Sequence, residues 1–185
     1  MSKKILILTG DAAEALEVYY PYYRLLEEQF TAEIASPQKK VLRSVIHTFE
    51  EMDTYTERTG YPFESQISFA EVDPSEYDGL IIPGGRAPEY IRMDENIPRI
   101  VGHFLETNKP VGAICHASLV LAALKNNKYF AGRTMTAYKA CQFDIESLGA
   151  AYTADTLVVD GNFVTAHAWP DLPGFMREFL KLFKG

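Results

Sequence analysis

The chain has 185 residues, of which 25 are acidic and 18 are basic, so its formal net charge is −7 at pH 7. At roughly 150 residues per domain and with 47% hydrophobic residues, residues 1–185 are expected to form a single folded domain rather than a disordered chain. The acidic balance argues against a general binder of nucleic acids or of anionic membrane surfaces. Because no apolar run approaches the roughly 18 residues of a membrane span and no signal sequence is recognisable, we expect a soluble, cytoplasmic protein.

Short apolar runs alternate with helical patterns along most of the chain. The first run, at 5–8, is typical of a buried parallel strand. A helix is predicted at 12–30, and Pro21 is expected either to kink this helix or to restart it. A second short strand is predicted at 32–35.

The segment from about 38 to 66 does not fit the alternation and is expected to be an insertion after the second strand. Within it, 41–48 has the pattern of a strand, whereas 52–62 is polar and rich in turn-forming residues. One capped helical turn is predicted at 73–77, because Asp73 is a suitable N-cap residue.

The second half of the chain resumes the alternation and then adds a hairpin. Strands are predicted at 79–82, 111–114 and 134–137, helices at 98–107, 117–124 and 142–148, a hairpin at 156–166 and a last helix at 173–183. This order predicts βαβ units, and therefore a doubly wound α/β sandwich with a parallel sheet covered on both faces. In such sheets the functional residues lie at the carboxyl ends of the strands.

The turn at 112–118 has the pattern of a nucleophile elbow. Cys115 occupies the reactive position, and Ala113 and Ala117 are the small residues needed two positions before and after it. The helix that follows would favour a thiolate there. The alternative is a buried cysteine that acts as a small apolar residue. Cys141, the other cysteine, is either a second thiol near the site or a half-buried helix residue, and two cysteines are too few for a disulfide framework.

Two other turns supply candidate partners for this thiol. Gly84 and Gly85 follow the third strand and offer backbone amides to an oxyanion, or else form only a tight turn. In the first helix, a protonated Glu17 carboxyl would donate a hydrogen bond to the Cys115 sulfur and lower the pKa of the thiol. The alternative is that Glu14 and Glu17 are ordinary solvated helix residues.

Together these motifs resemble the ThiJ/PfpI family, which belongs to the class I glutamine amidotransferase-like superfamily, and its intracellular protease I branch is the most similar. The resemblance rests on residues 14–21, 82–89 and 113–116 and extends to 158–162 and 176–179, so it covers nearly the whole chain except the insertion. It implies a flavodoxin-like doubly wound sheet sandwiched by helices, with an appended β-hairpin.

The resemblance also implies roles for individual residues. Cys115 would be the nucleophile, and Glu17 the protonated carboxyl that touches it. His116 would act as the base, and its amide would form the oxyanion pocket with Gly85. Glu89 would orient His116 across a subunit contact, which implies a homodimer or a higher homo-oligomer. The family chemistry needs no cofactor, and the four histidines lack the paired helical spacing of a metal site.

The chain departs from the protease-like pattern at three places. Residues 117–118 are Ala-Ser where Gly-Pro is usual, 165–170 stand where an arginine is usual, and the region 38–71 is longer than in the compact members. The last two segments contribute side chains that either roof the site and select small ligands or serve only in packing, namely Tyr55, Tyr61, Phe63, His167 and Trp169. These departures argue against peptide-bond cleavage more than against thiol chemistry.

Three functions fit these residues. The first is a cysteine hydrolase, an intracellular peptidase or amidase, in which Cys115 attacks a carbonyl group. The second keeps this nucleophile but takes a 2-oxoaldehyde or its protein adduct, as glyoxalases and deglycases do. The third is a redox or stress sensor in which Cys115 is oxidised to a sulfinate that Glu17 stabilises. The expected partner is therefore a small carbonyl or peptide substrate.

Overall fold

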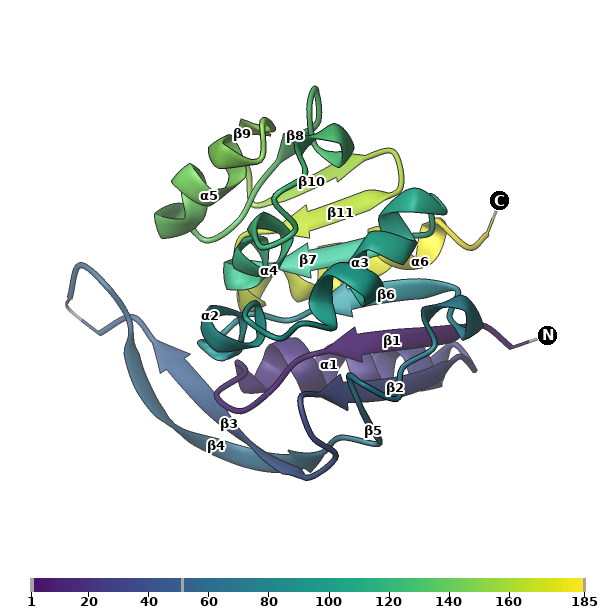
Figure 1. Ribbon diagram of the computed structural model, residues 1–185. Helices are drawn as coiled ribbons and strands as arrows, with labels where there is room; N and C mark the ends of the chain where they lie inside the picture. Colours follow the sequence, from purple (N-terminus) through teal and green to yellow (C-terminus); the bar gives the residue numbers. More distant parts are fainter. Residues whose placement is uncertain (1, 51, 185) are drawn as a thin grey trace.

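The computed structural model describes residues 2–50 and 52–184, and its centre is a seven-stranded sheet (Figure 1). In spatial order the strands are β10 (Leu157–Asp160), β11 (Phe163–Ala166), β7 (Val111–Ile114), β6 (Gly79–Ile82), β1 (Lys4–Leu8), β2 (Thr31–Ser36) and β5 (Ile67–Ser68). Every neighbouring pair is parallel except β10 and β11, which form the appended antiparallel hairpin. The doubly wound architecture expected from the alternation is confirmed.

Helices cover both faces of the sheet. They are α1 (Ala15–Glu27), α2 (Ala87–Ile91), α3 (Ile97–Glu106), α4 (Ser118–Ala122), α5 (Gln142–Ser147) and α6 (Leu172–Lys181). Figure 1 shows α2, α3 and α4 in front of the sheet and α1 and α6 behind it. Because both faces are covered, the central strands β1, β6 and β7 are almost entirely buried, which explains why they are apolar runs rather than alternating patterns.

The insertion forms a long hairpin, and here one sequence prediction was wrong. β3 (Val41–Thr48) pairs with β4 (Thr56–Glu64) in a separate antiparallel sheet, so most of the segment predicted to be turn-rich is a strand. Of the nine residues of β4, six are exposed and only Phe63 is buried against the body of the protein. A strand with so little buried surface lacks the apolar periodicity by which strands are recognised. Figure 1 shows the hairpin reaching past the carboxyl ends of the parallel strands.

Two further expectations need correction. The strand predicted at 134–137 is only β8 (Thr134–Met135), which pairs with β9 (Ala151–Tyr152) outside the main sheet. The place beside β7 is taken by β11, whose four residues are all buried. In addition, α1 does not restart at Pro21 but continues through it, although proline cannot supply the amide that would bond the carbonyl of Glu17.

Among the helices of the described residues, none combines the length and the apolar character needed to cross a lipid bilayer.

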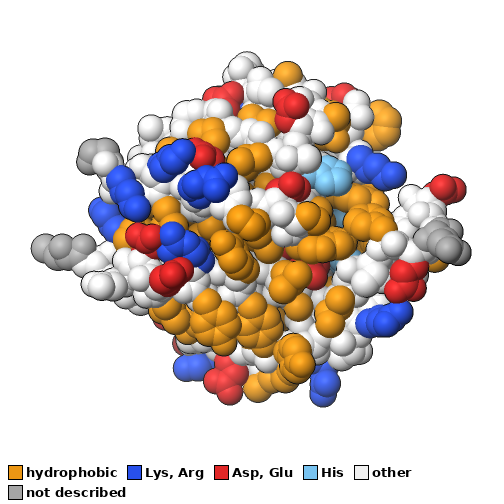
Figure 2. All heavy atoms as spheres, turned by 180° about the vertical axis from the view of Figure 1, so that it is seen from behind, with side chains coloured by type: hydrophobic (Ala, Val, Ile, Leu, Met, Phe, Trp, Pro, Cys, Tyr) orange, Lys and Arg blue, Asp and Glu red, His pale blue; other side chains and the backbone are white. Residues whose placement is uncertain are grey.

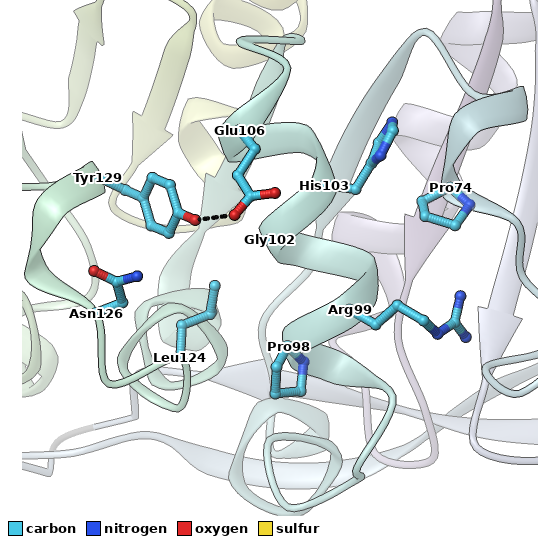
Figure 3. A pocket seen from close by; sticks show the side chains of 9 residues that line it. All are labelled: Pro74, Pro98, Arg99, Gly102, His103, Glu106, Leu124, Asn126 and Tyr129. Carbon is cyan, nitrogen blue, oxygen red and sulfur yellow. Dashed lines mark hydrogen bonds between the residues drawn. The ribbon is translucent and has the colours of Figure 1, made fainter.

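A surface pocket of about 410 Å³ runs along α3, and its lining includes none of the candidate site residues (Figure 3). Its polar side chains are bonded within the chain, because Arg99 donates to the carbonyls of Val72 and Phe69 and Glu106 accepts from the Tyr129 hydroxyl. Gly102 forms part of the lining, and a Cβ atom added there would have no other atom within 4 Å. This glycine in a helix interior is therefore not required by packing.

The substitution Gly102→Ala is expected to stabilise the protein by about 0.5–1 kcal/mol, because alanine loses less backbone entropy in a helix and meets no obstacle here. Thermal unfolding should show a melting temperature higher by about 1–4 °C. Gly112→Ala is the matched control with the opposite sign, since its Cβ would lie 2.7 Å from the Phe175 ring. A melting temperature that falls in Gly102→Ala would contradict this account of the pocket.

Candidate active site

Cys115 lies at the strained turn that the elbow pattern predicts. It directly follows β7 and begins a short 3-10 turn, Cys115–Ala117, that leads into α4. Its φ angle is +60°, a left-handed conformation that residues other than glycine rarely adopt. The side chain is only 2% exposed. The fold therefore directs one strained, covered thiol toward the carboxyl edge of the sheet.

Gly84 allows the turn after β6 to approach this elbow. A Cβ atom added to Gly84 would lie 2.5 Å from the Cβ of Cys115 and 2.9 Å from the amide nitrogen of His116, so a larger residue does not fit. The Gly84 amide donates a hydrogen bond of 2.7 Å to Oε2 of Glu17. Its hydrogen is thus engaged by a carboxyl group and is not free for an oxyanion.

Gly85 presents its amide differently. The residue has a φ of +73°, and its neighbours bond to the loop before α1, where the Arg86 amide donates to the carbonyl of Ala12. Hydrogen bonding from the backbone amides of Gly85 and His116 lowers the pKa of the Cys115 thiol. Two backbone donors from two different turns therefore converge on the thiol, which is the arrangement needed to hold a negative charge.

Two buried glutamates lie at the start of α1. Glu17 is fully buried, and Glu14 is the N-cap residue, whose Oε2 accepts a hydrogen bond of 3.0 Å from the Glu17 amide. Burial raises the pKa of Glu17 to about 8, aided by the charge of Glu14 and opposed by the Gly84 amide and the Cys115 thiol. Burial also raises the pKa of Glu14 to about 7. The reading of these residues as solvated helix glutamates is therefore wrong, because both are enclosed.

The thiol and the Glu17 carboxyl form one coupled pair. Burial raises the pKa of Cys115, and a charged Glu17 would raise it further, whereas the amides of Gly85 and His116 lower it. Two negative charges in contact within a buried site repel strongly, so the pair carries one charge at most near neutral pH. A thiolate at Cys115 therefore requires that Glu17 keep its proton.

His116 is in direct contact with the thiol. Its Nδ1 lies 3.2 Å from Sγ of Cys115. Burial, together with repulsion from His47, lowers the pKa of His116 to about 4, so the ring is neutral and can accept the thiol proton. In the described part of the chain no carboxyl group bonds to this ring. Glu89 lies exposed on α2, and its expected action across a subunit contact stays a prediction.

Aromatic side chains from three segments cover the elbow. Tyr55, at the hairpin tip, has its ring centre 5.8 Å from that of His116, and Tyr138 lies 5.1 Å from the same ring. Trp169 stacks on Phe49 of the hairpin tip at 5.4 Å. These rings, with His167 at 5.7 Å from Tyr138, form a cover that we call the roof: Phe49, Tyr55, Tyr138, His167 and Trp169.

The structure adds residues that the sequence analysis did not single out. Tyr138 follows the predicted strand 134–137, so its place after a strand end was the available signal. His47 and Glu57 lie on the hairpin, and neither follows a predicted strand of the main sheet, so the sequence did not mark them as site residues. The His47 ring packs 4.2 Å from that of Tyr55, and its Nε2 lies 3.2 Å from Oε2 of Glu57. Arg86 binds the same carboxylate through two hydrogen bonds of 2.7 Å.

Cys141 is buried rather than half-buried, at the end of a 3-10 turn before α5. Burial raises the pKa of its thiol to about 11. Within residues 2–50 and 52–184, no three His, Cys, Asp or Glu side chains are grouped as ligands for a metal ion.

Glu17→Gln is expected to stabilise the protein at alkaline pH. The folded state holds a proton on Glu17 that the unfolded state has lost, so the wild type loses stability as the pH rises from about 4.5 to 8. Glutamine has no such proton to hold, so its melting temperature should exceed that of the wild type by a few degrees at pH 8 and match it near pH 4. Glu27→Gln, on the exposed side of α1, should show no such change. Parallel pH curves for wild type and Glu17→Gln would contradict the raised pKa.

The chain is similar to known proteins over nearly its whole length. The model of the DJ-1/PfpI family matches residues 3–182. The deglycase PfpI of Pyrococcus furiosus is 37% identical over 181 residues, covering 98% of this chain and 99% of the relative. Protein DJ-1 homolog D of Arabidopsis thaliana is 37% identical over 188 residues, which cover 98% of this chain but only 48% of that protein.

Among solved structures, a two-domain protein of Anabaena variabilis with DJ-1/ThiJ/PfpI-like and ferritin-like domains superposes with a TM-score of 0.84 at 28% identity. The match covers 99% of this chain and 48% of that one. This chain thus spans about half the length of two of its relatives and the full length of a third. On the strength of the family match over nearly every residue, the chain belongs to the DJ-1/PfpI family.

Proposed function

We propose that this protein is an enzyme, independent of cofactors, in which Cys115 attacks the carbonyl carbon of a small 2-oxoaldehyde or of its adduct with an amine or thiol. The observation that carries the proposal is the set of contacts around one sulfur atom. His116 lies 3.2 Å away as an acceptor for the thiol proton, and the amides of Gly85 and His116 point at the sulfur. The name of the Pyrococcus relative, a deglycase, supports the same class of substrate.

The roof favours a small substrate over a peptide. Cys115 is 2% exposed and His116 is 8% exposed, and the Tyr55 ring lies over His116. An extended peptide would need an open groove on both sides of the scissile bond, and the hairpin tip would have to move away to provide one. A two- or three-carbon aldehyde would require a much smaller displacement of the roof. The peptidase hypothesis is therefore the weaker of the two, although it uses the same nucleophile.

The first chemical step joins sulfur to carbon. The Cys115 thiol gives its proton to Nδ1 of His116, and the sulfur attacks the aldehyde carbon, C1 of the substrate. The electron pair of the carbonyl bond moves to the oxygen, which is held by the amides of Gly85 and His116 and then takes the proton from His116. The product is a neutral hemithioacetal. Glu17 keeps its proton throughout and stabilises the sulfur while it is charged.

The remaining steps are an internal oxidation and reduction followed by hydrolysis. The hydrogen on C1 is transferred as a proton to C2, so C1 becomes a thioester carbonyl and C2 becomes an alcohol. Since C1 is oxidised as C2 is reduced, no external oxidant is required. Water then cleaves the thioester, releasing a 2-hydroxy acid and the free thiol. For an amine adduct, the amine leaves before the thioester forms.

Cys115→Ser and Cys115→Ala are expected to lower the turnover of methylglyoxal to 2-hydroxy acid by on the order of a thousandfold or more, because no other group takes the role of the sulfur. Cys141→Ala is the matched control and should retain activity, since that thiol is not at the elbow. A peptide and amide panel measured in parallel tests the peptidase hypothesis. Turnover that survives the loss of Cys115 would rule out both enzyme hypotheses, whereas no turnover with oxidation confined to Cys115 would favour a sensor.

Glu89 provides a test of the expected subunit contact. If it serves the His116 of a neighbouring chain, Glu89→Gln should lower activity at an unchanged oligomeric state. Mixing Glu89→Gln with inactive Cys115→Ala should then restore part of the activity, because mixed oligomers contain sites with both Cys115 and Glu89. Mixing with the doubly substituted Cys115→Ala/Glu89→Gln chain is the control and should restore none. A Glu89→Gln protein with wild-type activity would show that the acid is not needed.

A further inference from the structure

His47 and Glu57 form a histidine–carboxylate pair on the hairpin. His47 is 3% exposed in β3, and its Nε2 lies 3.2 Å from Oε2 of Glu57 in β4. Arg86, in the turn after β6, binds both oxygens of Glu57 at 2.7 Å. A carboxylate held in this way fixes the orientation and tautomer of an imidazole ring. The hairpin therefore carries a ring whose other nitrogen, Nδ1, has no hydrogen-bond partner within the described residues.

This pair lies against the roof that covers Cys115. The His47 ring packs at 4.2 Å from the ring of Tyr55 and at 6.4 Å from that of Trp169. Tyr55 is in turn 5.8 Å from the His116 ring, and the two imidazoles are close enough for His47 to lower the pKa of His116. Both rings thus contact the same tyrosine of the roof, one from the elbow and one from the hairpin.

The two histidines differ in what supports them. Nδ1 of His116 faces the sulfur, and no carboxylate of the described chain bonds to its ring. It is suited to removing the thiol proton, but it holds that proton weakly. His47 has a carboxylate partner, which stabilises its charged form. The reaction proposed above needs a second group that can take a proton from carbon and return it, and His116 is already committed to the sulfur and its oxyanion.

We propose that His47, oriented by Glu57, is the second acid–base residue of this site and carries the proton from C1 to C2 of the Cys115 adduct; this inference rests on the proposed function. Nδ1 takes the proton from C1, and the electrons of that C–H bond form a C1–C2 double bond. The carbonyl oxygen on C2 takes the proton of the C1 hydroxyl, which gives an enediolate with its negative charge on the C1 oxygen. His47 then returns its proton to C2 as the C1 oxygen re-forms a carbonyl bond, and the thioester results.

The charges that face His47 fix the expected pH dependence. Burial and Arg86 lower its pKa, whereas Glu57 raises it. The other groups around it are His116 on the elbow, the Tyr55 hydroxyl, and Glu14, whose carboxyl accepts the backbone amide of His47. Since His47 must be neutral to take a proton, kcat should decline as the pH falls below the pKa of His47. Without the carboxylate of Glu57 this decline should move to lower pH.

The test is a pH series of kcat and KM for methylglyoxal, with mass spectrometry of the protein during turnover. His47→Gln should lower kcat by about a hundredfold or more, as expected for the loss of a general base, with little change in KM. The adduct on Cys115 should accumulate, because its formation does not need His47. Glu57→Gln should give a smaller loss and shift the acidic limb of kcat to lower pH. Glu50→Gln on the same hairpin and His103→Gln on α3 are matched controls and should behave like the wild type.

The outcomes separate this inference from the proposed function. If Cys115→Ala abolishes turnover while His47→Gln keeps the wild-type kcat and acidic limb, the role of His47 is refuted and the proposed function stands. If Glu57→Gln leaves the acidic limb in place, the pairing has no part in catalysis. A wild type that does not turn over methylglyoxal, or a Cys115→Ala variant that does, overturns both. Circular dichroism of each variant, with His47→Asn as a second substitution, guards against misfolding.

Discussion

The site depends on the contact of one buried carboxyl group with two turns of the chain. Glu17 of α1 accepts the Gly84 amide and faces the Cys115 thiol, so a single uncharged acid joins the end of β6 to the end of β7. If Glu17 were ionised, it would repel a thiolate, and a side chain at position 84 would separate the two turns. The distances around the sulfur follow from this contact. The proton on Glu17 therefore serves both the packing of the two turns and the chemistry at the sulfur.

Much of this arrangement is predictable from the sequence because it depends on local patterns. Strands buried on both faces read as apolar runs, so β1, β6 and β7 are recognisable, and strand-to-helix turns locate Cys115 and the Gly84-Gly85 pair. The family resemblance implies that Glu17 touches the Cys115 thiol, whereas the sequence pattern alone left a solvated Glu17 as the alternative. The Gly84 amide was predicted to serve an oxyanion, but it donates its hydrogen bond to Glu17. This contact joins residues 67 positions apart, so no local pattern predicts it.

The roof could be predicted only in part, because the sequence analysis offered Tyr55, His167 and Trp169 as roof residues but did not single out Phe49 or Tyr138. β4 is mostly exposed, so its sequence carries no apolar period, and its pairing with β3 depends on a long-range register. His47, Tyr138 and Trp169 meet above the thiol only because the hairpin, the turn after β8 and the segment after β11 end at the same edge of the fold. The meeting of these three segments follows from the chain topology, and no residue spacing in the sequence predicts it.

Among the described residues, the hairpin is paired with itself and with no strand of the seven-stranded sheet. It is attached to the body by backbone bonds such as the one from the Val45 amide to the carbonyl of Ala13, by the buried Phe63 side chain, by the ion pair between Glu57 and Arg86, and by the aromatic contacts of its tip. Lifting the tip therefore breaks no hydrogen bond of the central sheet, and its free energy is that of a local opening rather than of global unfolding. The cover of the thiol is consequently built on a part of the molecule that lies outside the hydrogen-bonded frame of the central sheet, so the nucleophile and the core are enclosed by different sets of contacts.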